Sequence, residues 1–150
     1  MLAIYVDADA CPVKHEVCRV AKRCNLNVTF VSNMRMRIPA QDGVALVVVD
    51  GQFDAADNWI AEQAGKDDIV VTADIPLASR CVKRGARVVS PNGRVFSAAN
   101  IGDVLATRNL LAELRDAGTV RGGPPPFQQR DCSRFLQSLD QTVQDVKRAK

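Results

Sequence analysis

The sequence predicts one α/β domain in which helices cover both faces of a central, mostly parallel sheet. The chain has 150 residues, 47% of them apolar, which is enough for one buried core. Short β-rich apolar runs alternate with stretches of helical period, as is typical of β-α-β units. The sequence has no internal repeat and no linker long enough to divide two domains. We therefore expect residues 1–150 to form a single three-layer domain.

The first half of the chain contains three predicted strands and two predicted helices. Pro12 fits the first turn of a helix, and the apolar residues after it recur at helical spacing. The segment VALVVV is apolar throughout, which predicts a central strand that is buried on both faces. The expected strands are 2–6, 27–32 and 44–49, and the expected helices are 12–24 and 54–64.

The second half of the chain begins with a further strand and a helix, and it ends with two longer helices. Gly85 and Gly118 follow two of the helical segments and are expected to end them. The last segment repeats apolar residues at the spacing of one helix face. We expect strands at 68–72 and 87–90, the latter at a sheet edge, and helices at 76–84, 101–117 and 130–147.

Charge and cysteine content indicate which partners, thiol state and localisation to expect for the protein. Residues 1–79 carry a net negative charge and residues 80–150 a net positive charge, adding up to +3. This asymmetry suits a protein that binds cations and meets an anionic polymer, although chance placement of surface charge explains it equally well. The five cysteines form no C-x-x-C pair and are expected to be reduced thiols. No apolar run or leader predicts a membrane segment, so we expect a soluble cytoplasmic protein.

Acidic side chains follow three of the predicted strands at the point where each strand ends. In an open parallel α/β sheet, ligands bind outside the carboxyl ends of the strands. We therefore expect these side chains to share one site. They are Asp7 and Asp9 after the first strand, Asp50, Asp54 and Asp57 after the third, and Asp74 after the fourth.

Carboxylates that lie close together repel one another, and each raises the pKa of its neighbours. A hard divalent cation relieves this repulsion, and Mg²⁺ or Mn²⁺ is the ion that carboxylate oxygens and water prefer. Such an ion activates water and stabilises the charge that develops during phosphodiester cleavage. The pattern therefore favours a Mg²⁺ or Mn²⁺ site with hydrolytic chemistry.

Helix capping is the alternative explanation for part of the acidic set. Asp54 and Asp57 resemble a capping box, and Asp74 precedes the helix that begins near Pro76. Asp7 and Asp9 are harder to explain as caps, because alternation along an extended chain sends both side chains to one face. For Asp57, capping and a site role remain equally open.

Basic residues near the predicted site are candidates for holding a substrate. Asn33, Arg35 and Arg37 follow the second predicted strand, and Arg94 follows the strand at 87–90. Arginine binds phosphate groups through two parallel hydrogen bonds. A solvated loop with Met34 and its neighbour Met36 turned inward is the alternative.

Four motifs resemble a known family over nearly the whole chain. They are DADACPVK, DGQFDAADNWI, DIVVTADIPLA and GGPPPFQQRDCSRF, in that order. Together they are similar to the YaiI/YqxD family of uncharacterised bacterial proteins. That family is usually placed among PIN-like domains, a nuclease superfamily with a parallel sheet and acidic residues that bind Mg²⁺ or Mn²⁺. The resemblance implies a PIN-like fold and a metal-dependent nuclease that acts on nucleic acid, with RNA favoured.

Carried over by position, the resemblance implies a set of site residues. Asp7 and Asp9 come from the DAD motif, Asp54 or Asp50 from DGQFD, and Asp74 from TAD. Catalysis would rest on Asp7, Asp9, Asp54 and Asp74, with Asp50 as a further metal ligand. VVTAD matches the strand-Thr-x-Asp element of PIN-like nucleases, which places Thr72 among the substrate-binding residues. The segment from about 119 to 150 is specific to the family and has no assigned PIN counterpart.

Two other functions remain open from the sequence. A phosphohydrolase of the haloacid dehalogenase type also places D-x-D after its first strand, although DADAC lacks the Gly-Thr that usually follows. The order of DGQFD and Thr72 also runs against that mechanism. The second alternative is a regulatory domain that binds metal or nucleic acid without turnover.

Overall fold

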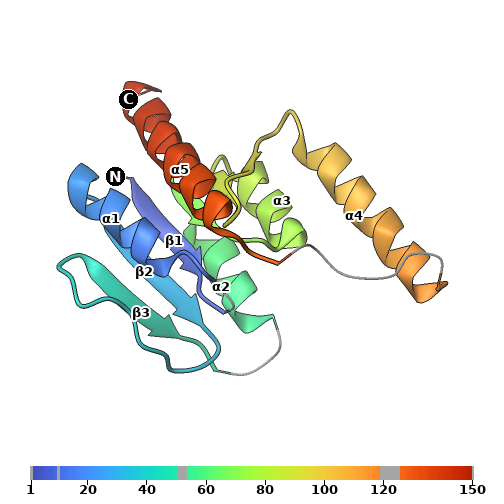
Figure 1. Ribbon diagram of the computed structural model, residues 1–150, viewed down its shortest axis with the longest axis horizontal. Coiled ribbons are helices and arrows are strands. Elements are labelled where there is room, and N and C mark those ends of the chain that lie inside the picture. The colour runs from blue at the N-terminus through green and yellow to red at the C-terminus, as the bar shows by residue number, and fades with distance from the viewer. Residues whose placement is uncertain (1, 10, 51–53, 119–125, 150) are drawn as a thin grey trace.

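The computed structural model describes residues 2–9, 11–50, 54–118 and 126–149. They form a six-stranded sheet between two layers of helices, which confirms the predicted three-layer α/β class (Figure 1). Residues 51–53 of the DGQFD motif and residues 119–125 and 150 of the family-specific segment lie outside the described residues. None of the helices that are described combines the length and apolar character of a membrane span.

The sheet has the strand order β3-β2-β1-β4-β5-β6. All neighbouring strands run parallel except β5 and β6. The chain adds strands on one side of β1 and then crosses to the other side, so a topological switch point lies between β1 and β4. Ligands in open α/β sheets bind at such a point. The strands are β1 (Ala3–Asp7), β2 (Asn27–Ser32), β3 (Val44–Val48), β4 (Ile69–Val71), β5 (Arg87–Val89) and β6 (Val95–Phe96).

Two predicted strand positions are wrong. The VALVVV segment forms β3, which lies at an edge of the sheet and pairs only with β2, and its Val48 is 41% exposed. The central strands are β1 and β4. The predicted edge strand forms β5, which is internal because the unpredicted β6 pairs with it. A two-residue strand is too short to show a period, and apolar content alone does not place a strand within a sheet.

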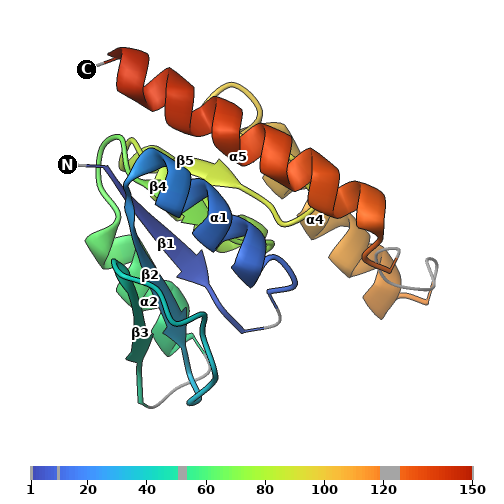
Figure 2. The same cartoon turned by 60° about the vertical axis from the view of Figure 1, so that its left-hand side comes forward.

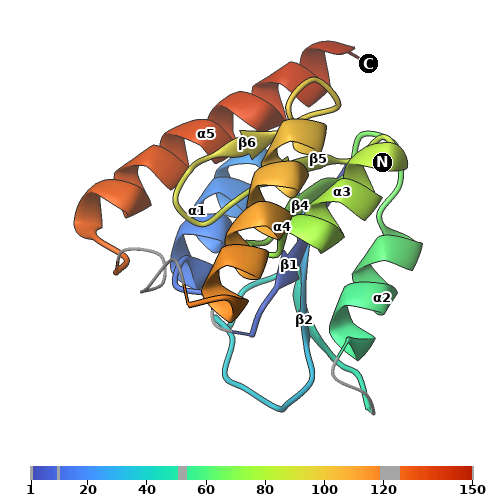
Figure 3. The same cartoon turned by 90° about the vertical axis from the view of Figure 1, so that its right-hand side faces the viewer.

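The predicted helices are all present, with ends that shift by one or two residues. Contacts join α1 to α5 and α2 to α3, while α4 packs on α3. Figure 2 shows α1 and α5 together over one face of the sheet, and Figure 3 shows α2 and α3 over the other. The helices are α1 (Lys14–Cys24), α2 (Ala55–Gln63), α3 (Ile75–Lys83), α4 (Ile101–Asp116) and α5 (Gln129–Ala149).

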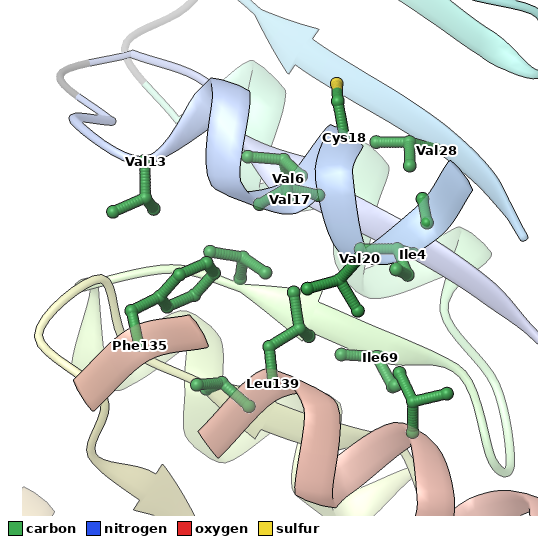
Figure 4. Packing of buried hydrophobic residues seen from close by; sticks show 14 of the residues in the cluster. Ile4, Val6, Val13, Val17, Cys18, Val20, Val28, Ile69, Phe135 and Leu139 are labelled. Atoms are coloured by element: carbon green, nitrogen blue, oxygen red, sulfur yellow. The ribbon is translucent and has the colours of Figure 1, made fainter. Parts of the chain in front are cut away.

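The first core cluster lies between the sheet and the pair α1 and α5. Phe135 and Leu139 of α5 are fully buried, and Figure 4 shows Leu139 near Val20 and Ile69, with the ring of Phe135 on the side of Val13 and Val17. Burying each such side chain stabilises the fold by about 1.5–3 kcal/mol. The C-terminal helix is therefore part of the core. The strand side chains of this cluster include Ile4, Val6, Val28, Phe30, Ile69, Val71 and Val89.

The second core cluster fixes α2 and α3 on the opposite face. Ala56 and Ile60 of α2 are buried in it, as is Leu77 of α3. Tyr5 of β1 and Trp59 of α2 meet edge to face, with ring centroids 6.0 Å apart. These contacts set the rotation of α2 about its axis, and thereby the direction of the polar residues between Ala56 and Ile60.

Candidate functional site

The candidate site begins at the switch point, where β1 and β4 end side by side. Val6 of β1 is level with Val71 of β4, so Asp7 is level with Thr72. The Thr72 hydroxyl donates a hydrogen bond of 2.9 Å to Oδ2 of Asp7. Thr72 is only 2% exposed, and its hydroxyl also accepts the N–H of Asp74 at 3.0 Å. Thr72 therefore orients Asp7 and links it to the start of α3.

Asp74 caps α3, as one of the alternatives from the sequence predicted. Its Oδ1 accepts the backbone N–H of Leu77 at 2.9 Å, and Pro76 occupies the first turn. The cap fixes the carboxylate close enough to Asp7 for its charge to raise the pKa of Asp7. Capping and a role in the site are thus combined in one residue.

The electrostatics of Asp7 reflect a crowded, partly buried group. Its pKa is raised from 3.8 to about 6, first by burial and then by the charges of Asp74 and Asp9. The hydrogen bond from Thr72 opposes this increase. Within the described part of the chain, no basic group lowers the pKa of Asp7. Ionised Asp7 is therefore held in an unfavourable environment.

Asp57 of α2 belongs with Asp7 and Asp74 to one cluster of carboxylates, the acidic group. Its pKa is also raised to about 6, by burial first and then by the charges of Asp74 and Asp7. Arg80 partly offsets this increase. A pair of Asp residues three positions apart at a helix start looks like a capping box, so the sequence left the role of Asp57 open. The burial of Ala56 and Ile60 turns Asp57 toward the sheet edge.

The structure places Asp50 and Asp54 differently from Asp57. Asp50 follows the edge strand β3, about 10 Å from β1 across two strand spacings. Asp54 precedes α2 at the N-cap position, but its side chain makes no capping hydrogen bond. Both side chains are exposed. Their predicted role as metal ligands stays a prediction, and Asp57 is the acidic residue of this region that is coupled to Asp7 and Asp74.

Asp9 lies on the other side of β1, against the end of β2. Its Oδ1 accepts the Ser32 hydroxyl at 2.6 Å, and its Oδ2 accepts the N–H of Asn33 at 3.1 Å. The Ser32 hydroxyl also accepts the N–H of Met34 at 3.1 Å, and Ser32 is fully buried. Sequence reasoning missed Ser32. The available signal was a hydroxyl residue at the end of a strand that flanks β1, as Thr72 is on the other side.

The predicted substrate-binding residues lie on two loops. In the loop after β2, Arg35 and Arg37 are exposed, while Met36 packs on the first core cluster. Met34 is 65% exposed, so the inward position considered for it is wrong. Arg94 precedes β6, and its guanidinium stacks over the ring of Phe96 at 5.6 Å from the centroid.

A hollow of about 530 Å³ lies away from the carboxylates. It is lined by residues of the β5–β6 hairpin and α5, among them Arg87, Phe96 and Thr142. Arg87 begins β5, whereas the acidic residues follow the carboxyl ends of the strands. The hollow and the acidic group therefore lie at opposite ends of the sheet.

The donor atoms of the acidic group are carboxylate oxygens, which suit a hard divalent cation. Carboxylate oxygens are the ligands that Mg²⁺ and Mn²⁺ prefer, and a cation would relieve the repulsion that raises both pKa values. Within the described ranges, no three His, Cys, Asp or Glu side chains already converge around a metal position. Mg²⁺ is commonly held by one or two carboxylates together with water and substrate phosphates. The residues therefore fit an ion that binds through few protein ligands.

Comparison with known proteins identifies the family. A family model described as "Uncharacterized BCR, YaiI/YqxD family" matches residues 5–145. The chain belongs to this family. The UPF0178 protein of Rhodospirillum centenum is 54% identical over 154 aligned positions that cover 100% of both chains. The UPF0178 protein of Azorhizobium caulinodans is 54% identical over 99% of this chain and 93% of its own length.

The YaiI/YqxD resemblance drawn from the four motifs is thus confirmed over the full length. A UPF0178 protein of Rhodopseudomonas palustris strain BisB18 is also 54% identical, over 97% of this chain and 94% of its own length. No solved structure matches the chain. These descriptions name no reaction.

Proposed function

We propose that this protein is a divalent-metal-dependent nuclease that hydrolyses phosphodiester bonds in nucleic acid, with RNA as the favoured substrate. The observation that carries the proposal is the coupling of Asp7 with Asp57 and Asp74 at the switch point of the sheet. The charge of Asp74 helps to raise the pKa of both Asp7 and Asp57, and residues with raised pKa values concentrate at functional sites. The resemblance to PIN-like nucleases supplies the reaction class.

The proposed roles follow from the contacts of each side chain. Asp7 and Asp74 would hold Mg²⁺ or Mn²⁺, with Asp57 as a third carboxylate. When bound, the ion supplies an activated water and stabilises the charge that develops on the phosphate. The Thr72 hydroxyl holds Oδ2 of Asp7, and the Leu77 N–H holds Oδ1 of Asp74, so both carboxylates are oriented before substrate arrives.

The positively charged residues complete the proposal. Arg35 and Arg37 are exposed on the loop that leaves the same edge of the sheet, where guanidinium groups bind the phosphates next to the cleaved bond. Aromatic residues make up only 5% of the chain, so few side chains are available to stack on bases. We therefore expect contacts to the backbone of the nucleic acid, with little dependence on base sequence.

The test is cleavage of end-labelled single-stranded RNA, with DNA of the same sequence in parallel, by the purified full-length protein in Mn²⁺. The native protein should cut, and Asp7→Asn and Asp74→Asn should not. Asp103→Asn, an exposed carboxylate on α4, is the matched control and should cut normally. Cleavage that survives both site substitutions would contradict the assignment.

The same experiment separates the alternatives. Mn²⁺ binding that depends on Asp7, without cleavage of RNA or DNA, would indicate a regulatory metal-binding domain. A covalent phosphate on Asp7 would indicate a phosphohydrolase. The order of DGQFD and Thr72 in the sequence runs against that mechanism.

A further inference from the structure

Two buried hydroxyl residues occupy matching places on either side of β1. Ser32 ends β2 and Thr72 follows β4, and each donates to a carboxylate that belongs to the end of β1 or the turn after it. Each hydroxyl also accepts the backbone N–H two residues further along the chain, at 3.1 Å from Met34 and 3.0 Å from Asp74. The two sides therefore share one hydrogen-bonding arrangement.

The two carboxylates differ in what else they contact. Both oxygens of Asp9 accept hydrogen bonds from the β2 side, from the Ser32 hydroxyl and the Asn33 N–H. Among the described residues, Asp7 accepts one such bond, through Oδ2 from the Thr72 hydroxyl. Neutral donors of the β2 side therefore engage both oxygens of Asp9 but only one oxygen of Asp7 is engaged from the β4 side.

We propose that Asp9 is a positioning residue, which with Ser32 ties the start of the loop of residues 33–43 to the end of β1 and so sets where Arg35 lies at this edge of the sheet. This inference rests on the proposed nuclease function and divides the DAD motif between two tasks. Asp7 would hold the ion, and Asp9 sets the place of the substrate-binding loop.

The rest of the loop is arranged to present its arginines. Met36 and Ile38 pack against the first core cluster, and Arg35 and Arg37 alternate with them and are exposed. Near the end of the loop, Nε2 of Gln41 donates to the Cys18 carbonyl of α1 at 3.1 Å. The middle and end of the loop are therefore held by α1 and the core, and its start is held by Asp9 and Ser32.

Arg35 depends most directly on this attachment. Its Cα lies three residues from Ser32 and so within about 10 Å of it, the reach of an extended chain. Removing the Ser32 hydroxyl would leave the Met34 N–H and Oδ1 of Asp9 without their partners. The loop start would then shift, while the hydrogen bonds around Asp7 and Asp74 stay intact.

The experiment measures Mn²⁺ affinity by calorimetry and steady-state cleavage of single-stranded RNA in the full-length protein. Asp9→Asn and Ser32→Ala should keep the Mn²⁺ affinity within about twofold and raise KM about tenfold, with kcat little changed. Asp7→Asn, the matched variant in the same motif, should lose Mn²⁺ binding. In an Arg35→Ala background, Ser32→Ala should raise KM no further, because both changes remove the same interaction.

The outcomes separate this inference from the proposed function. Loss of Mn²⁺ binding in Asp9→Asn as severe as in Asp7→Asn would make Asp9 a ligand and overturn the inference. A native protein that neither binds Mn²⁺ nor cuts nucleic acid would overturn the proposed function instead. In that case hydrogen exchange decides the positioning role. The Asn33 and Met34 amides should exchange slowly in the native protein and fast in Asp9→Asn, and equal rates would refute it.

Discussion

The two sides of the β1 end use the same hydroxyl arrangement for carboxylates in opposite surroundings. On the β4 side, Thr72 holds Asp7 among other negative charges, and the pKa of Asp7 is raised to about 6. On the β2 side, the Ser32 hydroxyl and the Asn33 N–H each donate to one oxygen of Asp9. The comparison teaches that two aspartates of one D-x-D motif can lie in opposite surroundings. The strand that flanks each Asp decides which hydrogen bonds its carboxylate accepts.

The crowding of carboxylates on the β4 side lowers the stability of the fold, which indicates a functional role for them. Carboxylates are crowded there without a basic partner for Asp7 in the described part of the chain, although a neutral residue would relieve the repulsion. Proteins commonly sacrifice stability at sites that serve function. On the β2 side, the Ser32 hydroxyl, both oxygens of Asp9 and the Met34 N–H all have hydrogen-bond partners.

The largest effect is expected from the Asp7→Asn substitution. Loss of the carboxylate removes the charge that attracts the ion, while Asn still accepts the hydrogen bond from Thr72. We expect Mn²⁺-dependent cleavage of RNA to fall about a thousandfold or more. Asp9→Asn should retain kcat, so similar losses of kcat in both variants would erase the difference between the two sides.

The next largest effect is a pH-dependent change in the free energy of unfolding of the Asp7→Asn variant. The folded-state pKa of Asp7 lies above its ordinary value of 3.8, so protonated Asp7 favours the folded state, and this contribution disappears as pH rises through about 6. Asp7→Asn should therefore raise the free energy of unfolding at pH 7.5 by about 2 kcal/mol and change it little at pH 4. Urea unfolding at the two pH values measures this. Asp9→Asn should not raise the free energy of unfolding in this way. An Asp7→Asn variant that is less stable than the native protein at pH 7.5 would refute the crowding argument.

A smaller effect is expected from Thr72. Thr72→Val keeps the shape of the side chain but removes the hydroxyl that orients Asp7 and accepts the Asp74 N–H. Loss of a group that hydrogen-bonds to a metal ligand weakens metal binding by about tenfold or more, so calorimetry should show Mn²⁺ affinity reduced to that degree. Thr72→Ser should restore it. The corresponding Ser32→Ala variant should keep its Mn²⁺ affinity, and weakening of equal size would show that both sides serve the ion.

The smallest expected effect is a change in Mn²⁺ affinity that distinguishes Asp57 from Asp54 at the start of α2. Asp57→Asn should weaken Mn²⁺ binding by about threefold to tenfold, because its charge is coupled to Asp74 and Asp7 but is partly offset by Arg80. Asp54→Asn, one turn earlier and exposed, should leave the affinity unchanged. The reverse result would support the position carried over from PIN-like nucleases.

Much of the local structure was predictable because it depends on residues that are close in sequence. The helices and most strands followed from apolar period, and Gly85 and Gly118 end α3 and α4 with positive φ angles of 89° and 75°. The cap of α3 by Asp74 was predictable for the same reason. The placement of acidic residues after parallel strands also predicted that Asp7 and Asp74 would approach one another, because the carboxyl ends of such strands share one edge.

The sequence by itself determined the fold class, the family and the sheet edge at which the acidic residues gather. Only the tertiary structure decided that VALVVV forms an edge strand and that Asp57 approaches Asp7. It also decided that the Ser32 hydroxyl donates a hydrogen bond to Asp9 and accepts one from the Met34 N–H. The physical reason is that strand order and helix rotation depend on packing between residues far apart in the chain. A local pattern records which face of an element is apolar, but not which neighbour will cover it.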